Sequence, residues 1–322
     1  MPEKVAFLFA GQGSQYIGMG KDLYEAFPEA RAVFDQADRV LGFSLSALCF
    51  DGPLSELTST KNCQPAVFTV SIAAWKAFRL QVPSFTAGLS LGEYAALVCA
   101  EAISFEDALY LVRCRGEFME DEAIKHPGKM LSVIGLDLTN IKDICREANV
   151  EIANINCPGQ VVVSGGIKEI KDAEDLAKAY GAKMTVVLEV SGAFHSSFMK
   201  GAADRLAKEL DKIKINVPKV PVVSNVTARP VISPAEIKEN LIKQVSSSVF
   251  WEDSIRFMLK QGVSCFFEFG PGRVLKGLMR RIDPTAQLTS IEKKEDILNL
   301  GSANHGPDQK KLNKKLNLVT LL

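Results

Sequence analysis

The sequence predicts an α/β fold built on a parallel sheet, with a smaller α/β unit inserted into it. Apolar strand candidates and helices alternate over residues 4–119, and this alternation favours a parallel sheet. The segment 128–190 has its own order of strand, helix, strand, strand, helix and strand, which can close a separate small core. The 322 residues, 47% of them hydrophobic, suffice for one large domain with such an insertion.

The first part of the chain supplies the alternating elements. An apolar strand candidate at 4–11 runs into a glycine-rich turn, whose glycines at 11, 13, 18 and 20 do not have the spacing of a dinucleotide-binding loop. Further along, Ser104 stands three residues before Asp107, which resembles a capping box at a helix start. The expected helices are 23–40, 64–78, 91–100 and 104–119, and the next expected strand is 84–88.

The inserted unit has the order of a ferredoxin-like subdomain. Its expected strands are 129–136, 151–156, 160–165 and 183–190, and its helices are 140–148 and 169–180. Later helices are expected at 196–210, from Ser233-Pro234, at 251–262 and at 271–282, with strands at 219–226 and 264–270. We therefore assign a catalytic core to 1–127 and 192–291, the subdomain to 128–191, and a polar tail to 292–322.

Composition excludes several classes of protein. Lysine plus arginine equals aspartate plus glutamate, 38 against 38, so we expect neither nucleic acid nor a membrane as partner. No apolar run approaches the roughly 18 residues of a membrane span. The cysteines form no CxxC pair, which argues against a disulfide framework or a metal site and favours a cytoplasmic protein. They are Cys49, Cys63, Cys99, Cys114, Cys145, Cys157 and Cys265. Without a seam of helix heptads, we expect a monomer.

One serine stands in a pattern typical of a nucleophile. Residues 88–92 read Gly-Leu-Ser-Leu-Gly between an expected strand and an expected helix, which is the arrangement of a nucleophile elbow. The tight turn would lift the hydroxyl of Ser90 clear of the sheet. The helix start behind it, including the Leu91 amide, would stabilise a developing oxyanion. The alternative is an ordinary serine in a turn of small residues.

A serine nucleophile needs a base near neutral pH, and the chain has three histidines. His126 precedes a proline in an expected loop, and His305 lies in the polar tail. His195 lies where the inserted subdomain returns to the core, a place beside an expected cleft. We assign the base to His195; the alternative is a buried histidine with a purely structural role.

Eight stretches in order extend these observations: "FAGQGSQ", "NCQPA", "GLSLGEYAALVCA", "LVRCRGEFM", "NCPGQVVVSG", "GAFHSSFM", "PVVSNV" and "FEFGPGRVLKGL". Together they resemble the malonyl-CoA:acyl carrier protein transacylases of fatty-acid synthesis, and equally the acyltransferases of polyketide synthases. The resemblance covers roughly residues 4–291. It implies an α/β-hydrolase-like core with the inserted ferredoxin-like subdomain.

The resemblance also implies roles for single residues. Ser90 would accept the acyl group and His195 would be its base. Arg115 would bind the free carboxylate of malonate, for which a guanidinium is well shaped. Arg113 lies two residues away and must point to another face of the same helix, so spacing alone does not choose between the two arginines.

Further residues follow from the same resemblance. The backbone amides of Gln12 and Leu91 would form the oxyanion hole, and Gln64 and Phe194 would line the pocket. The main-chain carbonyl of Phe250 would orient His195. Phe194 resembles the version of its motif that selects malonyl groups, because its ring leaves little room for a 2-methyl group. The sequence departs from the commoner pattern at positions 10 and 89, where it carries alanine and leucine.

The expected reaction is transfer of a malonyl group from malonyl-CoA to the phosphopantetheine thiol of an acyl carrier protein, through a malonyl-serine intermediate. No metal or other cofactor is expected, since malonyl-CoA is a substrate and the carrier protein brings the thiol. Three alternatives remain open: a trans-acting polyketide synthase acyltransferase, a hydrolase of acyl groups on carrier proteins, and a non-catalytic binding module.

Overall fold

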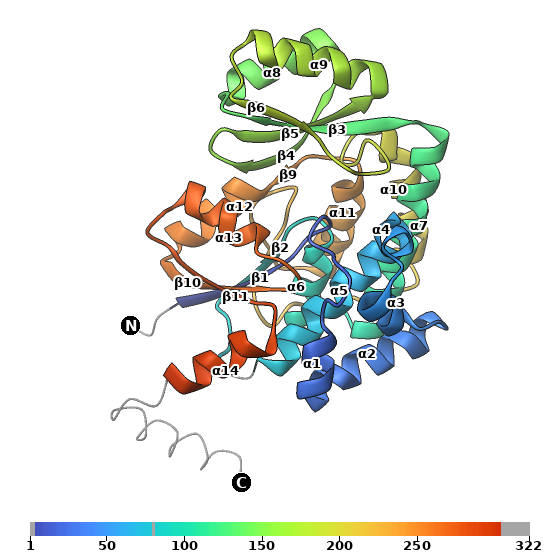
Figure 1. Cartoon of the computed structure of the whole chain (residues 1–322), viewed down its shortest axis with the longest axis vertical. Helices are drawn as coiled ribbons and strands as arrows, with labels where there is room; N and C mark the ends of the chain where they lie inside the picture. Colours follow the sequence, from blue (N-terminus) through green and yellow to red (C-terminus); the bar gives the residue numbers. More distant parts are fainter. Residues whose placement is uncertain (1–3, 79–80, 304–322) are drawn as a thin grey trace.

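The computed structural model describes residues 4–78 and 81–303. These residues form two sheets, a larger one in the body of the molecule and a smaller one above it (Figure 1). The larger sheet has six strands in the order β11-β10-β1-β2-β7-β8, and its pairs are parallel apart from β7 with β8. The predicted parallel α/β class is therefore confirmed.

The larger sheet is covered on both faces, because side chains of a strand point alternately to its two sides. Along β1, Val5, Phe7 and Phe9 enter one hydrophobic core, while Ala6 and Leu8 enter another. The strands are β1 (Lys4–Phe9), β2 (Phe85–Gly88), β7 (Val222–Val223), β8 (Pro230–Val231), β10 (Val263–Phe269) and β11 (Gln287–Ile291).

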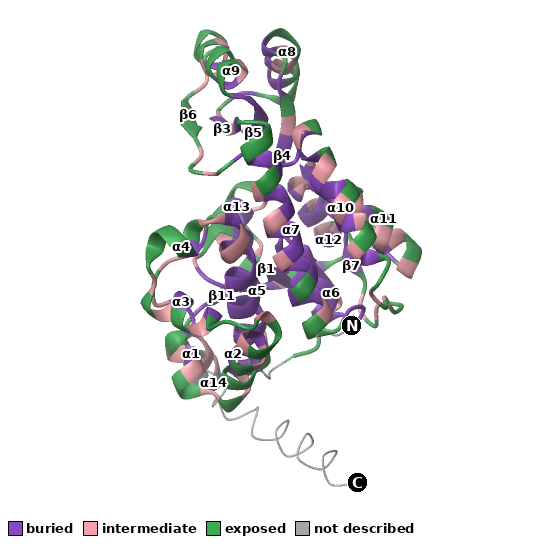
Figure 2. Cartoon of the chain, turned by 90° about the vertical axis from the view of Figure 1, so that its right-hand side faces the viewer, coloured by how far each residue is buried: buried purple, intermediate pink, exposed green. Residues whose placement is uncertain are grey.

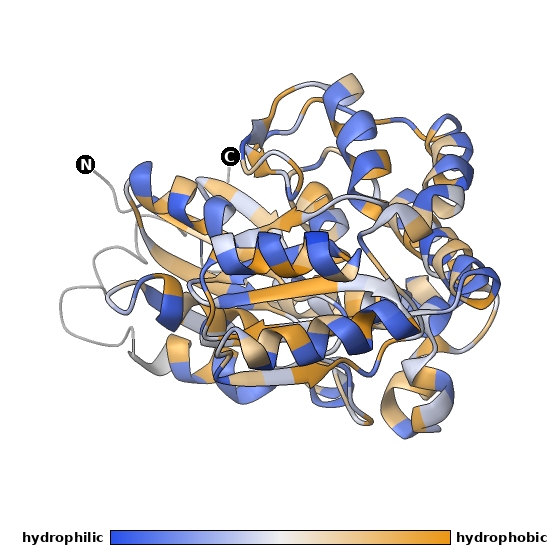
Figure 3. Ribbon diagram, turned by 90° about the horizontal axis from the view of Figure 1, so that it is seen from above, coloured by the Kyte–Doolittle hydropathy of each residue, from blue (hydrophilic) through white to orange (hydrophobic). Residues whose placement is uncertain are grey.

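Helices pack against both faces of the larger sheet. Figure 3 shows both hydrophobic and hydrophilic residues along most of the helices. Every residue of α6 is buried, which places this helix at the centre of the body (Figure 2). The helices of the body are α1 (Lys21–Ala26), α2 (Pro28–Leu41), α3 (Leu45–Asp51), α4 (Leu54–Thr58), α5 (Thr60–Ala77), α6 (Gly92–Cys99), α7 (Phe105–Lys125), α10 (Lys200–Leu210), α11 (Pro234–Val245), α12 (Trp251–Lys260), α13 (Val274–Ile282) and α14 (Lys294–Ala303), with a 3-10 turn, η1 (Ser197–Met199), before α10.

The smaller sheet belongs to the inserted segment, whose elements follow the predicted order. They are β3 (Gly128–Ile134), α8 (Leu138–Ala148), β4 (Glu151–Cys157), β5 (Gln160–Gly166), α9 (Ile167–Ala179) and β6 (Met184–Val187). The strands lie side by side as β6-β3-β5-β4, and α8 and α9 share with them a separate hydrophobic core. The limits that we assigned to this subdomain stay a prediction.

Several elements were not predicted from the sequence, among them α3, α4 and β8. A two-residue strand, β9 (Val249–Phe250), pairs with β4 and so joins the smaller sheet from outside the inserted segment. The strand β11 is short and largely polar in sequence, so it carries little apolar signal. The segment 292–322, predicted as a polar tail, contains the helix α14, which contacts α1 and β11. The rest of that tail, including His305, lies outside the described residues.

No helix within 4–78 or 81–303 combines the length and the apolar character that a membrane crossing requires.

The turn from β2 to α6 is packed backbone against backbone. A Cβ at Gly88 would overlap the carbonyl of Gly92, and a Cβ at Gly92 would overlap the carbonyl oxygen of Phe9. Backbone cannot move aside as a flexible side chain can. The two glycines of the Gly-x-Ser-x-Gly pattern are therefore required by space, and they bring α6 directly against β1 and β2.

We expect Gly88→Ala to destabilise the fold by more than about 3 kcal/mol, because the new methyl group overlaps main-chain atoms. Gly277→Ala is the matched control: this glycine is exposed in α13, and a Cβ there meets no atom within 4 Å. The control should stabilise by about 0.5–1 kcal/mol. Chemical denaturation measures both, and equal stabilities would contradict the packing argument.

Candidate active site

Ser90 stands at the turn between β2 and α6 in a backbone conformation that L-residues rarely adopt. Its φ is 52°, and a non-glycine residue in this left-handed region costs about 1 kcal/mol or more. Partners on both sides of the residue hold it there. The Ser90 amide donates to Asn225 Oδ1 at 2.6 Å, and Gln244 Nε2 donates to the Ser90 carbonyl at 3.0 Å. The turn is thus the strained strand-to-helix elbow that the sequence predicts.

His195 meets the serine side chain. The ring atom Nε2 lies 2.8 Å from Ser90 Oγ, although the two residues are 105 positions apart in the chain. The histidine also has a left-handed backbone, with a φ of 58°. The peptide before it is fixed by the smaller sheet, because Ser164 Oγ on β5 donates to the Phe194 carbonyl at 2.6 Å. The two sheets therefore supply one half of this pair each.

The other ring nitrogen shows that one prediction was wrong. His195 Nδ1 lies 2.8 Å from the main-chain carbonyl of Gln244, not that of Phe250. Gln244 is the penultimate residue of α11, and the last carbonyls of a helix have no partner within it. The Phe250 carbonyl instead precedes α12 and accepts from Ser254 Oγ at 2.8 Å. A helix end thus provides the acceptor, which fixes the tautomer with the proton on Nδ1.

The imidazole is held in its neutral form. Burial, together with the positive charge of Arg115, lowers the pKa of His195 to about 4, against hydrogen bonds to backbone carbonyls that raise it. A neutral ring with its proton on Nδ1 presents a lone pair on Nε2. That lone pair points at the hydroxyl of Ser90, which is the arrangement a general base requires.

Arg115 is almost fully buried, with 1% of its surface exposed. Its Nη1 donates to Gln64 Oε1 at 2.7 Å, and its Nη2 donates to Ser90 Oγ at 3.0 Å and to Gln244 Oε1 at 3.2 Å. Both amide oxygens are neutral, so neither cancels the positive charge. A buried guanidinium without a directly bonded carboxylate is costly, and it attracts an anion.

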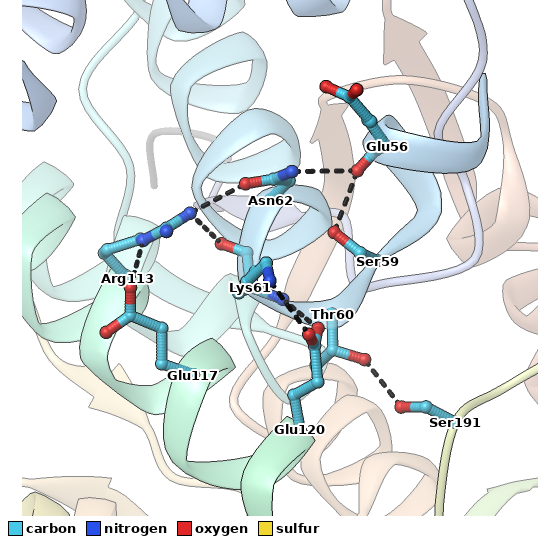
Figure 4. A network of polar contacts seen from close by, with 9 residues as sticks. All are labelled: Glu56, Ser59, Thr60, Lys61, Asn62, Arg113, Glu117, Glu120 and Ser191. Atoms are coloured by element: carbon cyan, nitrogen blue, oxygen red, sulfur yellow. Dashed lines mark hydrogen bonds and ion pairs between the residues drawn. The ribbon is translucent and has the colours of Figure 1, made fainter. Parts of the chain in front are cut away.

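The neighbouring arginine on the same helix points elsewhere. Arg113 Nε pairs with Glu117 at 2.7 Å, and its Nη1 donates to the Lys61 carbonyl and to the Asn62 side chain. Figure 4 shows this network at the start of α5, where Arg113 keeps 24% of its side chain exposed. The geometry therefore distinguishes two arginines that spacing alone could not.

A cavity of about 420 Å³ lies between the two sheets. Ser90, His195 and Arg115 line it together, with Gln12 and Phe194. The remainder of its wall mixes apolar and polar side chains from both units, including Leu89, Met119, Met130, Ser132, Asn154, Asn156, Gln160, Val162 and Glu189. Five of the sequence-predicted residues thus share one cavity.

Two predicted residues lie behind the cavity wall. Gln64 is fully buried and does not line the cavity; it acts on Arg115 from within the body. The prediction that Gln64 lines the pocket was therefore wrong, because α5 carries it on a face turned to α7. The side chain of Leu91 is likewise buried in the core. Its amide stands at the start of α6, where helical N–H groups have no helical partner.

Three residues of this site escaped sequence analysis: Glu93, Asn225 and Gln244. Asn225 stands in the quoted motif "PVVSNV", and Glu93 stands two residues after the elbow's Leu91, so the motifs held a signal without revealing its meaning. Gln244 lies in an amphipathic helix with no distinguishing pattern. Their roles depend on contacts between residues 49 to 154 positions apart, which no local pattern encodes.

An elbow serine, a neutral imidazole and a buried cation define a site for acyl transfer to and from a hydroxyl. The chain belongs to the family described as "Acyl transferase domain", whose match extends over residues 6–283. It is accordingly an acyltransferase.

Several similar proteins have one activity in their names. A malonyl CoA-acyl carrier protein transacylase of Bacillus subtilis (strain 168) is 48% identical, over 91% of this chain and 95% of its own. One of Escherichia coli (strain K12) is 42% identical, over 89% and 95%. The solved structure of a malonyl CoA-acyl carrier protein transacylase from Coxiella burnetii has a TM-score of 0.90 at 40% identity, with 93% and 97% covered. A malonyl-transacylase in complex with the acyl-carrier protein of a type II polyketide synthase has a TM-score of 0.89 at 40% identity, with 92% and 98% covered.

We expect the His195 imidazole to stay neutral from about pH 8 down to about pH 5, because its pKa lies well below the ordinary value of about 6.5. Nuclear magnetic resonance of the ring nitrogens, with His195→Gln to assign the signals, measures this directly. A titration midpoint near the ordinary value would mean that the ring is solvated rather than buried against Arg115.

Proposed function

We propose that this protein transfers the malonyl group of malonyl-CoA to the phosphopantetheine thiol of an acyl carrier protein, with Ser90 as the transient carrier. The observation that supports it most is a single contact: Arg115 Nη2 lies 3.0 Å from Ser90 Oγ. A cation one hydrogen bond from the nucleophile selects an acyl group whose own anion lies very near its reacting carbonyl. Malonate meets this condition, since a single CH₂ separates its carboxylate from the thioester.

In the first half-reaction, Nε2 of His195 takes the hydroxyl proton of Ser90 as Oγ attacks the thioester carbonyl. The ring becomes an imidazolium, with its Nδ1–H donated to the carbonyl at the end of α11. The negative end of the helix dipole stabilises that charge. The tetrahedral intermediate then collapses, the C–S bond breaks, and the imidazolium returns the proton to the departing CoA thiolate.

The oxyanion of that intermediate forms beside the start of α6. We assign its two donors to the backbone amides of Leu91 and Gln12, since Leu91 follows the nucleophile and Gln12 lines the same cavity. Each such donor is worth about 3 kcal/mol of transition-state stabilisation. The left-handed turn at Ser90 presents the first donor without any movement of the chain.

Arg115 then retains the bound acyl group. In the malonyl-serine ester the carboxylate replaces Ser90 Oγ as the acceptor of Nη2, and a guanidinium binds a carboxylate through two parallel hydrogen bonds. Phe194 stands at the cavity wall, where its ring leaves little room for a branched acyl group.

In the second half-reaction a thiol of the carrier protein replaces CoA. His195 takes the thiol proton, the sulfur attacks the ester carbonyl, and Ser90 leaves with the proton returned. The first half-reaction turns a thioester into a serine ester, and the second turns that ester into a new thioester. The acyl group therefore ends in a bond of the same kind as the one it left, and no cofactor is called for. The amide side chains in the cavity wall, Asn154, Asn156 and Gln160, can hydrogen-bond the amide-rich pantetheine arm that both CoA and the carrier protein present. Assays with carrier proteins of fatty-acid and of polyketide synthesis will show which of them accepts the malonyl group.

The cytoplasm is the proposed compartment. All seven cysteines lie in the described residues, none of them forms a disulfide, and five are buried; cysteines outside disulfides are typical of a reducing environment.

We expect Ser90→Ala to abolish the acyl-enzyme. Intact mass spectrometry after mixing with malonyl-CoA should detect one malonyl group on the unaltered protein, discharged by added holo carrier protein, and none on the variant. Ser233→Ala, which removes the N-cap of α11 away from the cavity, should still accept the group. A labelled Ser90→Ala variant would refute the proposed nucleophile, and rapid discharge by water alone would favour a hydrolase.

We expect Arg115→Ala to lower kcat/KM for malonyl-CoA by about 100-fold to 1,000-fold, because a buried ion pair with the substrate is lost. Acetyl-CoA has no carboxylate, so its transfer should change far less. Arg113→Ala removes the same charge from the same helix outside the cavity and should change neither. Equal losses for both substrates would contradict the role of Arg115 in selecting malonate.

A further inference from the structure

Glu93 is a buried carboxylate that the mechanism above does not use. It lies in the first turn of α6, three residues after Ser90, with 2% of its surface exposed. Its Oε2 accepts two hydrogen bonds, from Gln244 Nε2 at 2.6 Å and from the Asn225 amide at 3.1 Å. Buried carboxylates are rare unless they are paired, so this one requires an explanation.

Both donors to Glu93 are residues that hold the serine. The side chain of Asn225 accepts a hydrogen bond from the Ser90 amide, and its Nδ2 donates one to the Gly88 carbonyl at 2.7 Å. Gln244 Nε2 donates one hydrogen bond to the Ser90 carbonyl and another to Glu93. One carboxylate oxygen therefore fixes both supports of the left-handed peptide.

The same carboxylate reaches the cation and the imidazole through Gln244. The side-chain amide of Gln244 donates to Glu93 and accepts from Arg115 Nη2 at 3.2 Å, so it bridges the two opposite charges. The main-chain carbonyl of Gln244 is the acceptor of His195 Nδ1. A direct ion pair would occupy the guanidinium, whereas a bridged one balances its charge and leaves Nη2 facing the serine.

We infer that Glu93 is a positioning residue, whose ionised carboxylate aligns the serine, the imidazole and the guanidinium through Gln244 and Asn225. This inference rests on the proposed function, because it assumes that those three groups carry out the transfer. Glu93 itself touches neither substrate nor the reacting atoms.

The pH dependence of the reaction should report on this carboxylate. Burial raises the pKa of Glu93 to about 7, against hydrogen bonds from Asn225 and Gln244 and the charge of Arg115, which lower it. The charged or titratable groups that interact with Glu93 are Arg115 on α7 and Tyr94 on its own helix. Loss of the negative charge as the pH falls through about 7 should weaken the alignment, well above the pKa of His195.

The decisive variant is Glu93→Gln, which keeps an acceptor oxygen and removes the charge. We expect kcat/KM for malonyl-CoA at about pH 8 to fall by about 10-fold to 100-fold, the usual effect of losing charge-assisted hydrogen bonds. The activity of the unaltered enzyme should fall below about pH 7, and this fall is the acidic limb of its pH profile. The variant should lack the acidic limb, so that the two rates converge towards about pH 5.5.

Glu268→Gln is the matched control. Glu268 is equally buried, at 1% exposed, and accepts the Leu275 and Lys276 amides at 2.8 and 3.2 Å at the start of α13. Its variant should lose stability and keep the acidic limb. An acidic limb that persists in Glu93→Gln, or a loss of activity that merely follows its thermal stability, would overturn the inference.

Two further measurements keep the outcomes separate. If Glu93→Gln does not fold, Glu93→Asp is the second variant, because it keeps the charge on a shorter side chain. Its kcat/KM should be lower than that of the unaltered enzyme, and its pH profile should keep the acidic limb. Absence of that limb would overturn the inference. Ser90→Ala is assayed beside them by mass spectrometry. Glu93→Gln should still accept a malonyl group slowly on Ser90, whereas a labelled Ser90→Ala would refute the proposed function whatever Glu93 does.

Discussion

The left-handed peptide at Ser90 is the constraint on which the site depends. It turns the chain from β2 into α6 within three residues, and this turn exposes the hydroxyl while placing the start of a helix behind it. The strain is affordable because polar partners hold the peptide on both sides and because two glycines let backbone approach backbone. Without those supports the serine would relax to an ordinary turn, and neither the imidazole nor the guanidinium would lie within hydrogen-bond distance of it.

Charged and neutral groups alternate with distance from that turn. A cation lies next to the nucleophile, an amide lies beyond the cation, and a carboxylate lies beyond the amide. The carboxylate offsets the cost of burying the guanidinium without binding it directly. The neutral imidazole lies on the other side of the serine, where the nearby positive charge favours its unprotonated form. The imidazole is therefore in the protonation state that a general base requires.

Much of this could be predicted from the sequence. Alternating strands and helices indicate the parallel sheet, the spacing of 88–92 indicates the elbow, and the scarcity of histidines leaves His195 as the candidate base. The polar supports could not be found in this way, because Asn225 and Gln244 meet Ser90 only through the tertiary fold. Phe250 failed as the orienting residue for a related reason: the free carbonyl belongs to a helix end, and the position of that end is not fixed by a motif. The strand β9 has only two residues, and β11 has only two apolar residues in five, so neither has enough of an apolar pattern to be detected.

The distribution of the site along the chain has a consequence for the newly made protein. Ser90 is synthesised early, while its base, its two peptide supports and the acceptor of the imidazole proton follow 105 to 154 residues later. A nascent chain still emerging from the ribosome therefore carries the hydroxyl in a relaxed turn with no means of activating it. Such a chain cannot consume thioesters wastefully, and the enzyme becomes competent only when α11 has been translated and docked.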